Sequence, residues 1–364
     1  MKDSFQALRI AAVGLGWVTL HRHLPALRKT PGLEVVGLVD RRPGHAGSIA
    51  RRMGIARHFQ GDSLGAIPWL EEVDAFSIGT APASHAQLIR QALELGRHVI
   101  TEKPFAMHPR EGEELVALAR ARRKTLAIVH NFQFSRSLRR LQDDIAAGRY
   151  GKIRFVHAQQ LGNPARRLPA WYEELPLGLY YDESPHMFYL LRALAPAPLT
   201  FLRAEVHPST LGKRTPAWIS AHYAAGAEGI PVKLDMGFES PLSEWHVAVA
   251  GEHCFGDVDM FRDIYLRLPN DGAHTTWPVL RTSLAASWGH WVQHLVSGPA
   301  HLAGTLRYGN DEVFRRFAAA ARASAEPQGI GPDDALAVLQ MQHQILEQAE
   351  LLGSTLGHAA TAAS

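Results

Sequence analysis

An apolar stretch that ends in two glycines near the start of the chain constrains the fold more than any other feature. The run LRIAAVGLG predicts a strand that enters the turn Gly14-Leu15-Gly16, and His21–Arg28 fits a helix. Gly14 allows a tight turn, and Gly16 lets a phosphate approach the backbone at the positive end of the helix. Thr19 replaces the third glycine of a dinucleotide fingerprint, which predicts looser packing of helix on strand. The turn therefore predicts a nucleotide site or, alternatively, a turn that serves packing alone.

Short apolar runs and helical runs alternate from Leu8 to about Ile128, which predicts a parallel sheet covered on both faces. Beyond Asn131, longer runs with period-two alternation predict an antiparallel sheet with one face less covered. We expect an α/β protein: an N-terminal Rossmann doubly wound parallel sheet in residues 1–130, and a C-terminal α+β domain with a large, mostly antiparallel, open-faced sheet in residues 131–364. A final helix and tail are expected at 332–364.

Length and composition agree with two domains. The chain has 364 residues, which exceeds the length at which a single core usually keeps growing. Its single cysteine, Cys254, excludes an intramolecular disulfide and a multi-cysteine metal site, and it fits a reducing cytoplasm, the expected location.

Charge and hydropathy exclude several partner classes. The formal net charge is only +3, and arginines such as Arg120 and Arg122 stand beside acidic residues, so we expect solvated helix faces and no nucleic acid. No uninterrupted apolar stretch is long enough to cross a bilayer, so no membrane partner is expected. His290 and His294 have i, i+4 spacing, but Trp288 and Trp291 interleave them, which favours packing or a pocket edge over a metal site.

Asp40 ends the second predicted strand, where a dinucleotide's ribose would lie. Its carboxylate can accept hydrogen bonds from both ribose hydroxyls, which favours NAD and repels the 2′-phosphate of NADP. Arg41 and Arg42 follow at once, and either could bind that phosphate instead or stand in solvent beside the adenine edge. NAD is the preferred prediction and NADP the alternative.

Two further groups carry proton chemistry. Glu102-Lys103-Pro104 ends a predicted strand, where an ammonium can bind a substrate hydroxyl and stabilise alkoxide character, although the tripeptide could also be surface decoration. Asp182 and His186 are four residues apart, so on a helix both side chains project to the same side. A carboxylate beside an imidazole suits a general acid/base, whereas a lone helical histidine is usually structural. Pro185, just before His186, is expected to distort the helix.

Together these segments resemble the glucose–fructose oxidoreductase / inositol dehydrogenase family, often named Gfo/Idh/MocA, over nearly the whole chain. The motifs that carry the resemblance are Gly14-Leu15-Gly16, Thr80-Ala81-Pro82 with His85, Glu102-Lys103-Pro104, Asn131-Phe132 with the later GRYGKIRFV, and Asp182-Glu183-Ser184-Pro185-His186. The most specific of them is Glu102-Lys103-Pro104. The resemblance implies cofactor-binding residues Gly14, Gly16, Trp17, Val18, Asp40, Arg41, Thr80, Pro82, His85, Glu102, Lys103 and Asn131.

The resemblance implies an NAD(P)-dependent oxidoreductase that transfers hydride between nicotinamide and a hydroxyl or ketone carbon of a sugar, inositol or nucleotide-sugar. His186 would exchange the hydroxyl proton, Lys103 would hold the substrate oxygen, and Asp182 would bind a neighbouring hydroxyl or orient His186. Two alternatives remain: a redox-neutral, hydrolase-like enzyme that retains NAD, and a non-catalytic nucleotide or sugar sensor. Loss of the lysine or histidine would be expected in a sensor, and both are present.

The substrate is predicted from less specific residues. The loop from Asn163 to Tyr172 contains Arg166, Arg167 and Trp171, which could bind the diphosphate and base of a nucleotide-sugar or could form an ordinary surface loop. Tyr180 and Tyr181 could stack on a sugar or donate a proton, although core packing suits at least one of them. By resemblance, the open sheet face within Phe201–Leu268 is expected to form the interface of a homodimer or homotetramer.

Overall fold

A computed structural model describes residues 7–362, with side chains described through residue 349. The chain divides into two compact units. The first contains the residues up to Asn131 together with Gly309–Gln340, and the second contains Phe132–Tyr308 and the residues from Met341 onward. The sequence-based division places everything after residue 130 in the second domain, whereas the structure groups Gly309–Gln340 with the first unit.

The first unit is built on a six-stranded parallel sheet, called sheet A, in the order β3-β2-β1-β4-β5-β6. Its strands are β1 (Leu8–Val13), β2 (Leu33–Asp40), β3 (Arg57–Gln60), β4 (Ala75–Ile78), β5 (His98–Thr101) and β6 (Leu126–Ile128). The order reverses between β1 and β4, as in a doubly wound sheet, so the predicted Rossmann fold is confirmed. Strand β3, which is short, polar and at the sheet edge, is absent from the sequence-based prediction.

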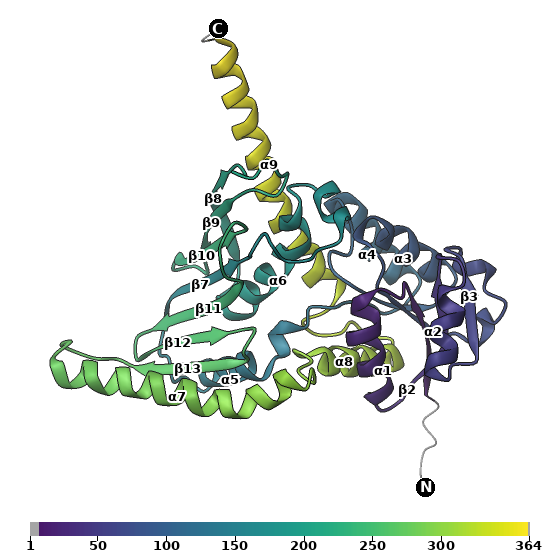
Figure 1. Cartoon of the computed structure of the whole chain (residues 1–364), viewed down its shortest axis with the longest axis horizontal. Helices are drawn as coiled ribbons and strands as arrows, with labels where there is room; N and C mark the ends of the chain where they lie inside the picture. The colour runs from purple at the N-terminus through teal and green to yellow at the C-terminus, as the bar shows by residue number, and fades with distance from the viewer. Residues whose placement is uncertain (1–6, 363–364) are drawn as a thin grey trace. The chain divides into compact units, whose positions relative to one another are not determined.

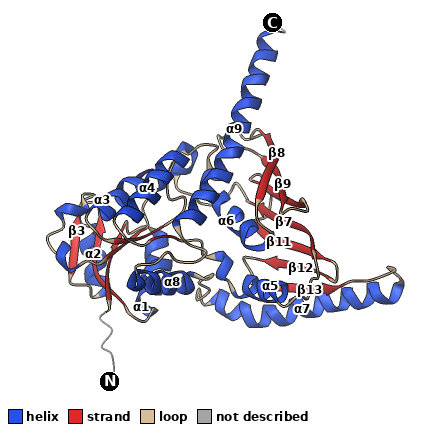
Figure 2. Ribbon diagram, turned by 180° about the vertical axis from the view of Figure 1, so that it is seen from behind, coloured by secondary structure: helices blue, strands red, loops and turns tan. Residues whose placement is uncertain are grey.

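Helices cover both faces of sheet A, which is why its inner strands are apolar along their whole length. The helices are η1 (Thr19–His23), α1 (Leu24–Lys29), α2 (His45–Met53), η2 (Leu64–Ala66), η3 (Leu70–Glu72), η4 (Pro82–Ser84), α3 (His85–Glu94), α4 (Pro109–Ala121), α8 (Asn310–Ala323) and the first part of α9 (Pro332–Ala362). Helices α1 and α8 lie side by side on one face, and α3 and α4 lie side by side on the other (Figures 1 and 2).

The second unit is built on a seven-stranded sheet, called sheet B, in the order β13-β12-β11-β7-β10-β9-β8. Its strands are β7 (Ile153–Leu161), β8 (Leu199–His207), β9 (Trp218–Ala225), β10 (Ile230–Gly237), β11 (Glu244–Gly251), β12 (Cys254–Asp259) and β13 (Ile264–Pro269). All neighbours are antiparallel except β7 and β10, so the predicted mostly antiparallel sheet is confirmed.

The helices of this unit are η5 (Phe132–Phe134), α5 (Arg136–Ala146), η6 (Ala170–Glu174), α6 (Leu179–Leu194), α7 (Thr276–Leu302) and the rest of α9. Helix α6 packs on one face of sheet B, against β7 and β10. Helix α7 lies along the edge strand β13. Helix α9 continues to Ala362, through most of the residues predicted as a tail; residues 363 and 364 lie outside the described part of the chain.

Among residues 7–362, no helix is both long enough and apolar enough to span a membrane.

Candidate functional site

The glycine turn follows β1 directly and leaves the backbone open at Gly16. Gly14 has φ +80°, and a Cβ there would stand 2.4 Å from the Thr80 methyl group, so only glycine fits. At Gly16 the nearest atom to an added Cβ is the Gly79 carbonyl oxygen at 4.0 Å. A ligand therefore has room against the backbone at the helix N-terminus, where dinucleotide phosphates bind.

Thr19 stands in place of the third glycine without loosening the packing. It is fully buried, and its hydroxyl donates to the Gly14 carbonyl oxygen at 2.6 Å. A Cβ on Gly79 would lie 2.2 Å from the Thr19 hydroxyl. The close approach therefore requires a glycine at position 79, in the neighbouring loop, and not at position 19. Thr19 begins a π-helical segment, η1, which continues as α1. The predicted looser packing at this position is therefore wrong.

Trp17 and Val18 are the first helical residues after the glycine turn. Trp17 is exposed, and its ring stacks on His21 with 5.0 Å between ring centroids. The Arg22 guanidinium lies 5.3 Å from the centre of the same ring. These contacts fix the indole at the surface of the glycine turn.

Asp40, at the end of β2, is a hub of hydrogen bonds. Oδ2 accepts from the Leu15 amide at 2.8 Å and from Arg42 Nη2 at 2.7 Å, and Oδ1 accepts from the Arg42 amide and Nε at 2.9 Å each. Burial raises the pKa of the Asp40 carboxyl, but the hydrogen bonds from Arg42 and Leu15 lower it by more, to about 2. Arg42 is thus the partner of Asp40, while Arg41 is exposed to solvent.

The strand end at β5 places Glu102 and Lys103 in a half-buried turn, and the Lys103–Pro104 peptide bond is cis. His23 Nε2 donates to Glu102 Oε1 at 2.9 Å, which leaves Nδ1 to accept from the Ser77 hydroxyl at 3.1 Å. Burial raises the pKa of Glu102, but His23 and Lys103 lower it by more, so the carboxylate stays ionised. Sequence reasoning missed His23, because no local pattern marks a partner 79 residues away.

His85 lies in the core and ties two loops together. It is fully buried, with Nδ1 2.7 Å from the Pro104 carbonyl oxygen and Nε2 3.0 Å from that of Thr80. Burial lowers the pKa of its imidazole. Its full burial leaves no exposed surface for the predicted contact with cofactor, and its ring nitrogens instead join the loops at Thr80 and Pro104. Of the other predicted cofactor residues here, Thr80 is half-buried, and Pro82 and Asn131 are buried.

Asp182 and His186 both lie on α6, one turn apart, and their side chains are 8% exposed each. Nδ1 of His186 lies 2.8 Å from the Tyr189 hydroxyl, which also accepts from the Phe132 amide at 3.1 Å. The rings of Phe132 and Trp245 flank the imidazole, with centroids 5.1 and 5.3 Å away. The Tyr189 hydroxyl is therefore placed to orient His186, and the orienting role predicted for Asp182 stays a prediction.

Pro185 does not break α6, because a side chain from α9 takes over its missing hydrogen bond. Proline has no amide proton, so the Tyr181 carbonyl oxygen one turn earlier loses its helical donor. Gln342 Nε2 donates to that oxygen at 2.6 Å and lies 3.1 Å from the Ser184 hydroxyl. The predicted distortion around His186 is thus avoided.

The aromatic residues before Asp182 lie in the core. Tyr180 and Tyr181 are fully buried. The Tyr180 hydroxyl donates to the Gln342 carbonyl oxygen at 2.9 Å, and the Tyr181 hydroxyl lies 3.1 Å from His343 Nε2. Core packing, the alternative left open by the sequence, accounts for both, and the predicted substrate contacts do not fit their burial.

The loop after β7 borders a cavity of about 160 Å³ within the second unit. Arg166 lines it, and its Nη1 is paired with Glu183 Oε1 of α6 at 3.0 Å. Arg167 is exposed and Trp171 is half-buried beside Tyr172, and neither Arg167 nor Trp171 lines the cavity. Of the three predicted substrate residues in this loop, Arg166 is therefore the one that lines this cavity.

One cluster within the described residues has the composition of a metal site. Ligand atoms of Glu244, His246 and Asp259 lie within 4.8 Å of one another. Arg262 occupies the same carboxylates: Nη1 and Nη2 lie 2.6 and 2.7 Å from the Glu244 oxygens, and Nη1 also contacts Asp259. The guanidinium already supplies the positive charge, so we assign no metal here.

Comparison with known proteins agrees with the fold. The Gfo/Idh/MocA family model, described as an oxidoreductase family with an NAD-binding Rossmann fold, matches residues 8–130. The dehydrogenase from Chromobacterium violaceum superimposes with a TM-score of 0.75 at 16% identity, over 98% of this chain and 99% of that one.

Two curated relatives differ in what they act on. The 1-carboxy-3-chloro-3,4-dihydroxycyclohexa-1,5-diene dehydrogenase of Comamonas testosteroni is 29% identical over 235 residues, 63% of this chain and 56% of the relative. The dTDP-3,4-didehydro-2,6-dideoxy-α-D-glucose 3-reductase of Actinomadura kijaniata is 32% identical over 152 residues, 40% of this chain and 43% of the relative. The chain thus spans about half the length of the curated relatives it matches.

Proposed function

We propose that this chain, whose residues 8–130 match the Gfo/Idh/MocA oxidoreductase family model, is an NAD(P)-dependent dehydrogenase or reductase. Its substrate class is a sugar, inositol or nucleotide-sugar, of which one hydroxyl or ketone carbon reacts. The Actinomadura relative, a reductase of a dTDP-sugar, supports this substrate class.

The observation that carries the proposal is the polar interior of α6. Asp182 and His186 are buried on a helix that packs on sheet B, where apolar side chains would be cheaper to bury. Phe132, Trp245 and Tyr189 hold the imidazole in one orientation. A buried and oriented histidine with a carboxylate one turn away is suited to general acid/base catalysis.

The protein groups have separate tasks in this proposal. A bound nicotinamide supplies the hydride chemistry. Lys103 binds the substrate oxygen and stabilises its negative charge as the C–O bond order changes. His186 takes the hydroxyl proton during oxidation or returns it during reduction, and Asp182 binds a neighbouring hydroxyl or orients His186.

We propose NAD rather than NADP as the preferred cofactor. The residues fit a dinucleotide, because the glycine turn leaves open backbone at Gly16 and Asp40 remains ionised at the end of β2. The Asp40 charge disfavours a 2′-phosphate, while Arg42 moderates that repulsion. Asp40→Ser should therefore raise the ratio of kcat/KM with NADP to kcat/KM with NAD.

The test is a spectrophotometric assay of nicotinamide with a panel of inositols, aldoses and nucleotide-sugars. One substrate class should be turned over, and both Lys103→Ala and His186→Ala should lower that turnover at least about 100-fold. Lys29→Ala removes an exposed lysine at the end of α1 and serves as the matched control, with unchanged activity. Two results would contradict the proposal. In the first, the protein binds the dinucleotide, but no substrate of the panel causes the dinucleotide to be oxidised or reduced. In the second, turnover survives in both variants.

A further inference from the structure

Helix α7 turns its small and polar residues toward its own unit. The residues on the face toward β13 are half-buried or buried: Pro278, Thr282, Ala286, Gly289, Gln293, Ser297 and Ala300. Gln293 Nε2 donates to the Tyr265 carbonyl oxygen at 2.6 Å, and its Oε1 accepts from the Tyr265 amide at 3.0 Å. Helix α7 is thus attached to the sheet edge by the side-chain amide of Gln293 and not by large apolar side chains of its own.

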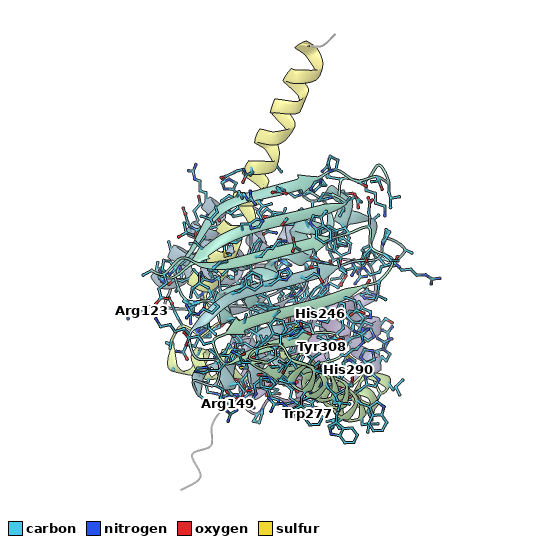
Figure 3. All side chains as sticks on the ribbon, turned by 90° about the vertical axis from the view of Figure 1, so that its left-hand side faces the viewer. Arg123, Arg149, His246, Trp277, His290 and Tyr308 are labelled. Atoms are coloured by element: carbon cyan, nitrogen blue, oxygen red, sulfur yellow. The ribbon has the colours of Figure 1, made fainter. Side chains whose placement is uncertain are left out.

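The opposite face of α7 carries the large apolar side chains, which we call the α7 stripe. Its members are Trp277, Leu280, Leu284, Trp288, Trp291, Leu295 and Leu302, and they are 45–90% exposed. Steps of three, four and seven residues keep them on one side of a helix with 3.6 residues per turn. Figure 3 shows Trp277 on the side of α7 away from the strands of sheet B. A helix on the surface of a monomer is expected to turn its apolar face to the core and its polar face to solvent, and α7 has the opposite arrangement.

The α7 stripe is too large for an incidental surface patch. The three tryptophans are 72%, 69% and 59% exposed, which is roughly 500 Å² at about 250 Å² for each whole side chain. That area alone reaches the largest apolar patch of a typical monomer, about 300–600 Å². With the four leucines, the stripe approaches the ~800 Å² that each partner buries in a standard stable interface.

The length of α7 leaves part of the stripe beyond the reach of the sheet. Twenty-seven residues correspond to about 40 Å of helix at 1.5 Å per residue. The six residues of β13 correspond to about 20 Å of strand at 3.3 Å per residue. Figures 1 and 2 both show α7 extending past the end of β13.

Charge narrows the choice of partner. Arg281 is the one Asp, Glu, Lys or Arg in Thr276–Leu302, so the helix offers nothing that selects a charged protein or nucleic acid. Helices that lie on membranes combine an apolar face with a polar face rich in Lys and Arg, which α7 lacks. An uncharged apolar stripe is best matched by another uncharged apolar stripe, and a second copy of the chain supplies one.

We propose that α7 is a dimerisation helix, in which the α7 stripe packs antiparallel against the same stripe of a second copy. A two-fold axis brings identical patches together, with the middle of each stripe at the axis. That middle is marked by Trp288 and Trp291, whose rings stack with centroids 6.2 Å apart. This interface differs from the sheet face within Phe201–Leu268 that the family resemblance suggests.

Sedimentation velocity on the full chain tests the proposal. The wild type should sediment as a dimer of twice 40.1 kDa, and Leu284→Glu should weaken the dimer at least 100-fold, to a monomer at micromolar concentration. Leu202→Glu is the matched control, because Leu202 of β8 is 60% exposed and Leu284 is 61% exposed. Leu284→Gln adds no charge and keeps helix propensity, so it covers the case in which the glutamate variant does not fold.

Three results would overturn the proposal. They are a monomeric wild type, a dimer that withstands both Leu284 variants, and a dimer that Leu202→Glu dissociates while Leu284→Glu does not. Co-sedimentation with phosphatidylcholine–phosphatidylserine vesicles distinguishes the remaining occupant: binding that requires Leu284 would assign the stripe to a lipid surface instead. Unchanged circular dichroism in the variants separates loss of assembly from loss of fold.

Discussion

Helices α6 and α7 belong to the same unit and distribute their side chains in opposite ways. Helix α6 buries Asp182, Glu183 and His186. Helix α7 has one charged residue among 27, yet its large apolar side chains face solvent and Ser297 is its one buried residue. From hydropathy alone, one would expect α7 to be buried and α6 to be exposed.

The contrast separates two reasons for breaking the rule that apolar side chains go inside. Buried polar groups cost free energy unless they are hydrogen-bonded, and α6 meets this condition through Tyr189, Arg166 and Gln342. Exposed apolar groups cost little in the monomer but favour association. The first exception therefore indicates chemistry, and the second indicates assembly.

The largest expected effect comes from the imidazole of α6. His186→Ala should lower kcat by about 10²–10⁴-fold, because general acid/base catalysis contributes that much. Trp291→Gln, on α7, should leave kcat within about twofold. Steady-state kinetics on the substrate found in the panel measures both values. Equal losses in the two variants would remove the distinction between the helices.

A second, smaller loss should follow from Tyr189→Phe, which removes the hydroxyl beside His186 Nδ1. We expect kcat to fall about tenfold, equivalent to roughly 1.4 kcal/mol, with little change in KM for either substrate. The double variant with His186→Ala should be no slower than His186→Ala alone, because Tyr189 acts through the imidazole. Additive losses would instead mean that Tyr189 has an independent role.

Stability should respond to the amide that supports α6. Gln342→Ala leaves the Tyr181 carbonyl oxygen without a donor, so the free energy of unfolding should fall by about 1–3 kcal/mol. Gln340→Ala, an exposed position on the same helix, should change it by less than about 0.5 kcal/mol. Urea denaturation compares the two. If Gln342→Ala costs no more than its control, Pro185 is tolerated for another reason.

The smallest effect is expected on α7 itself. Trp288→Gln should change the unfolding free energy of the dilute monomer by less than about 0.5 kcal/mol, although it removes a tryptophan. At concentrations where the dimer forms, the same variant should melt at a lower temperature than the wild type, because association stabilises the folded state. A large loss in the monomer would show that the indole packs on its own unit.

Sequence patterns predicted the positions of candidate functional groups that lie at strand ends. Asp40 ends an apolar strand of sheet A, and Gly14 and Glu102 directly follow two others, so strand prediction places them on the same edge. The same reasoning gave the order of domains and the nature of both sheets. The partners of these groups, such as His23 for Glu102, depend on contacts between distant residues that no local pattern encodes.

Helix α7 escaped prediction for a physical reason. Pro278, Gly289, Gly298 and Pro299 are residues that usually end helices, so the segment offers no uninterrupted helical pattern. The apolar residues of α7 do have helical spacing, but they lie on its outer face, where a monomer offers them nothing to pack against. Strand β12 was missed as well, since Gly256 and two aspartates break its apolar alternation.

The hydrogen bond from Gln342 to α6 depends on a residue that is synthesised long after α6 itself. The support for the interrupted turn of α6 stands 161 residues after the carbonyl oxygen that it binds. In the first unit, the Ile128 amide at β6 similarly donates a hydrogen bond to the Ile330 carbonyl oxygen, which is synthesised much later. These two hydrogen bonds can therefore form only after residues 342 and 330 have been synthesised.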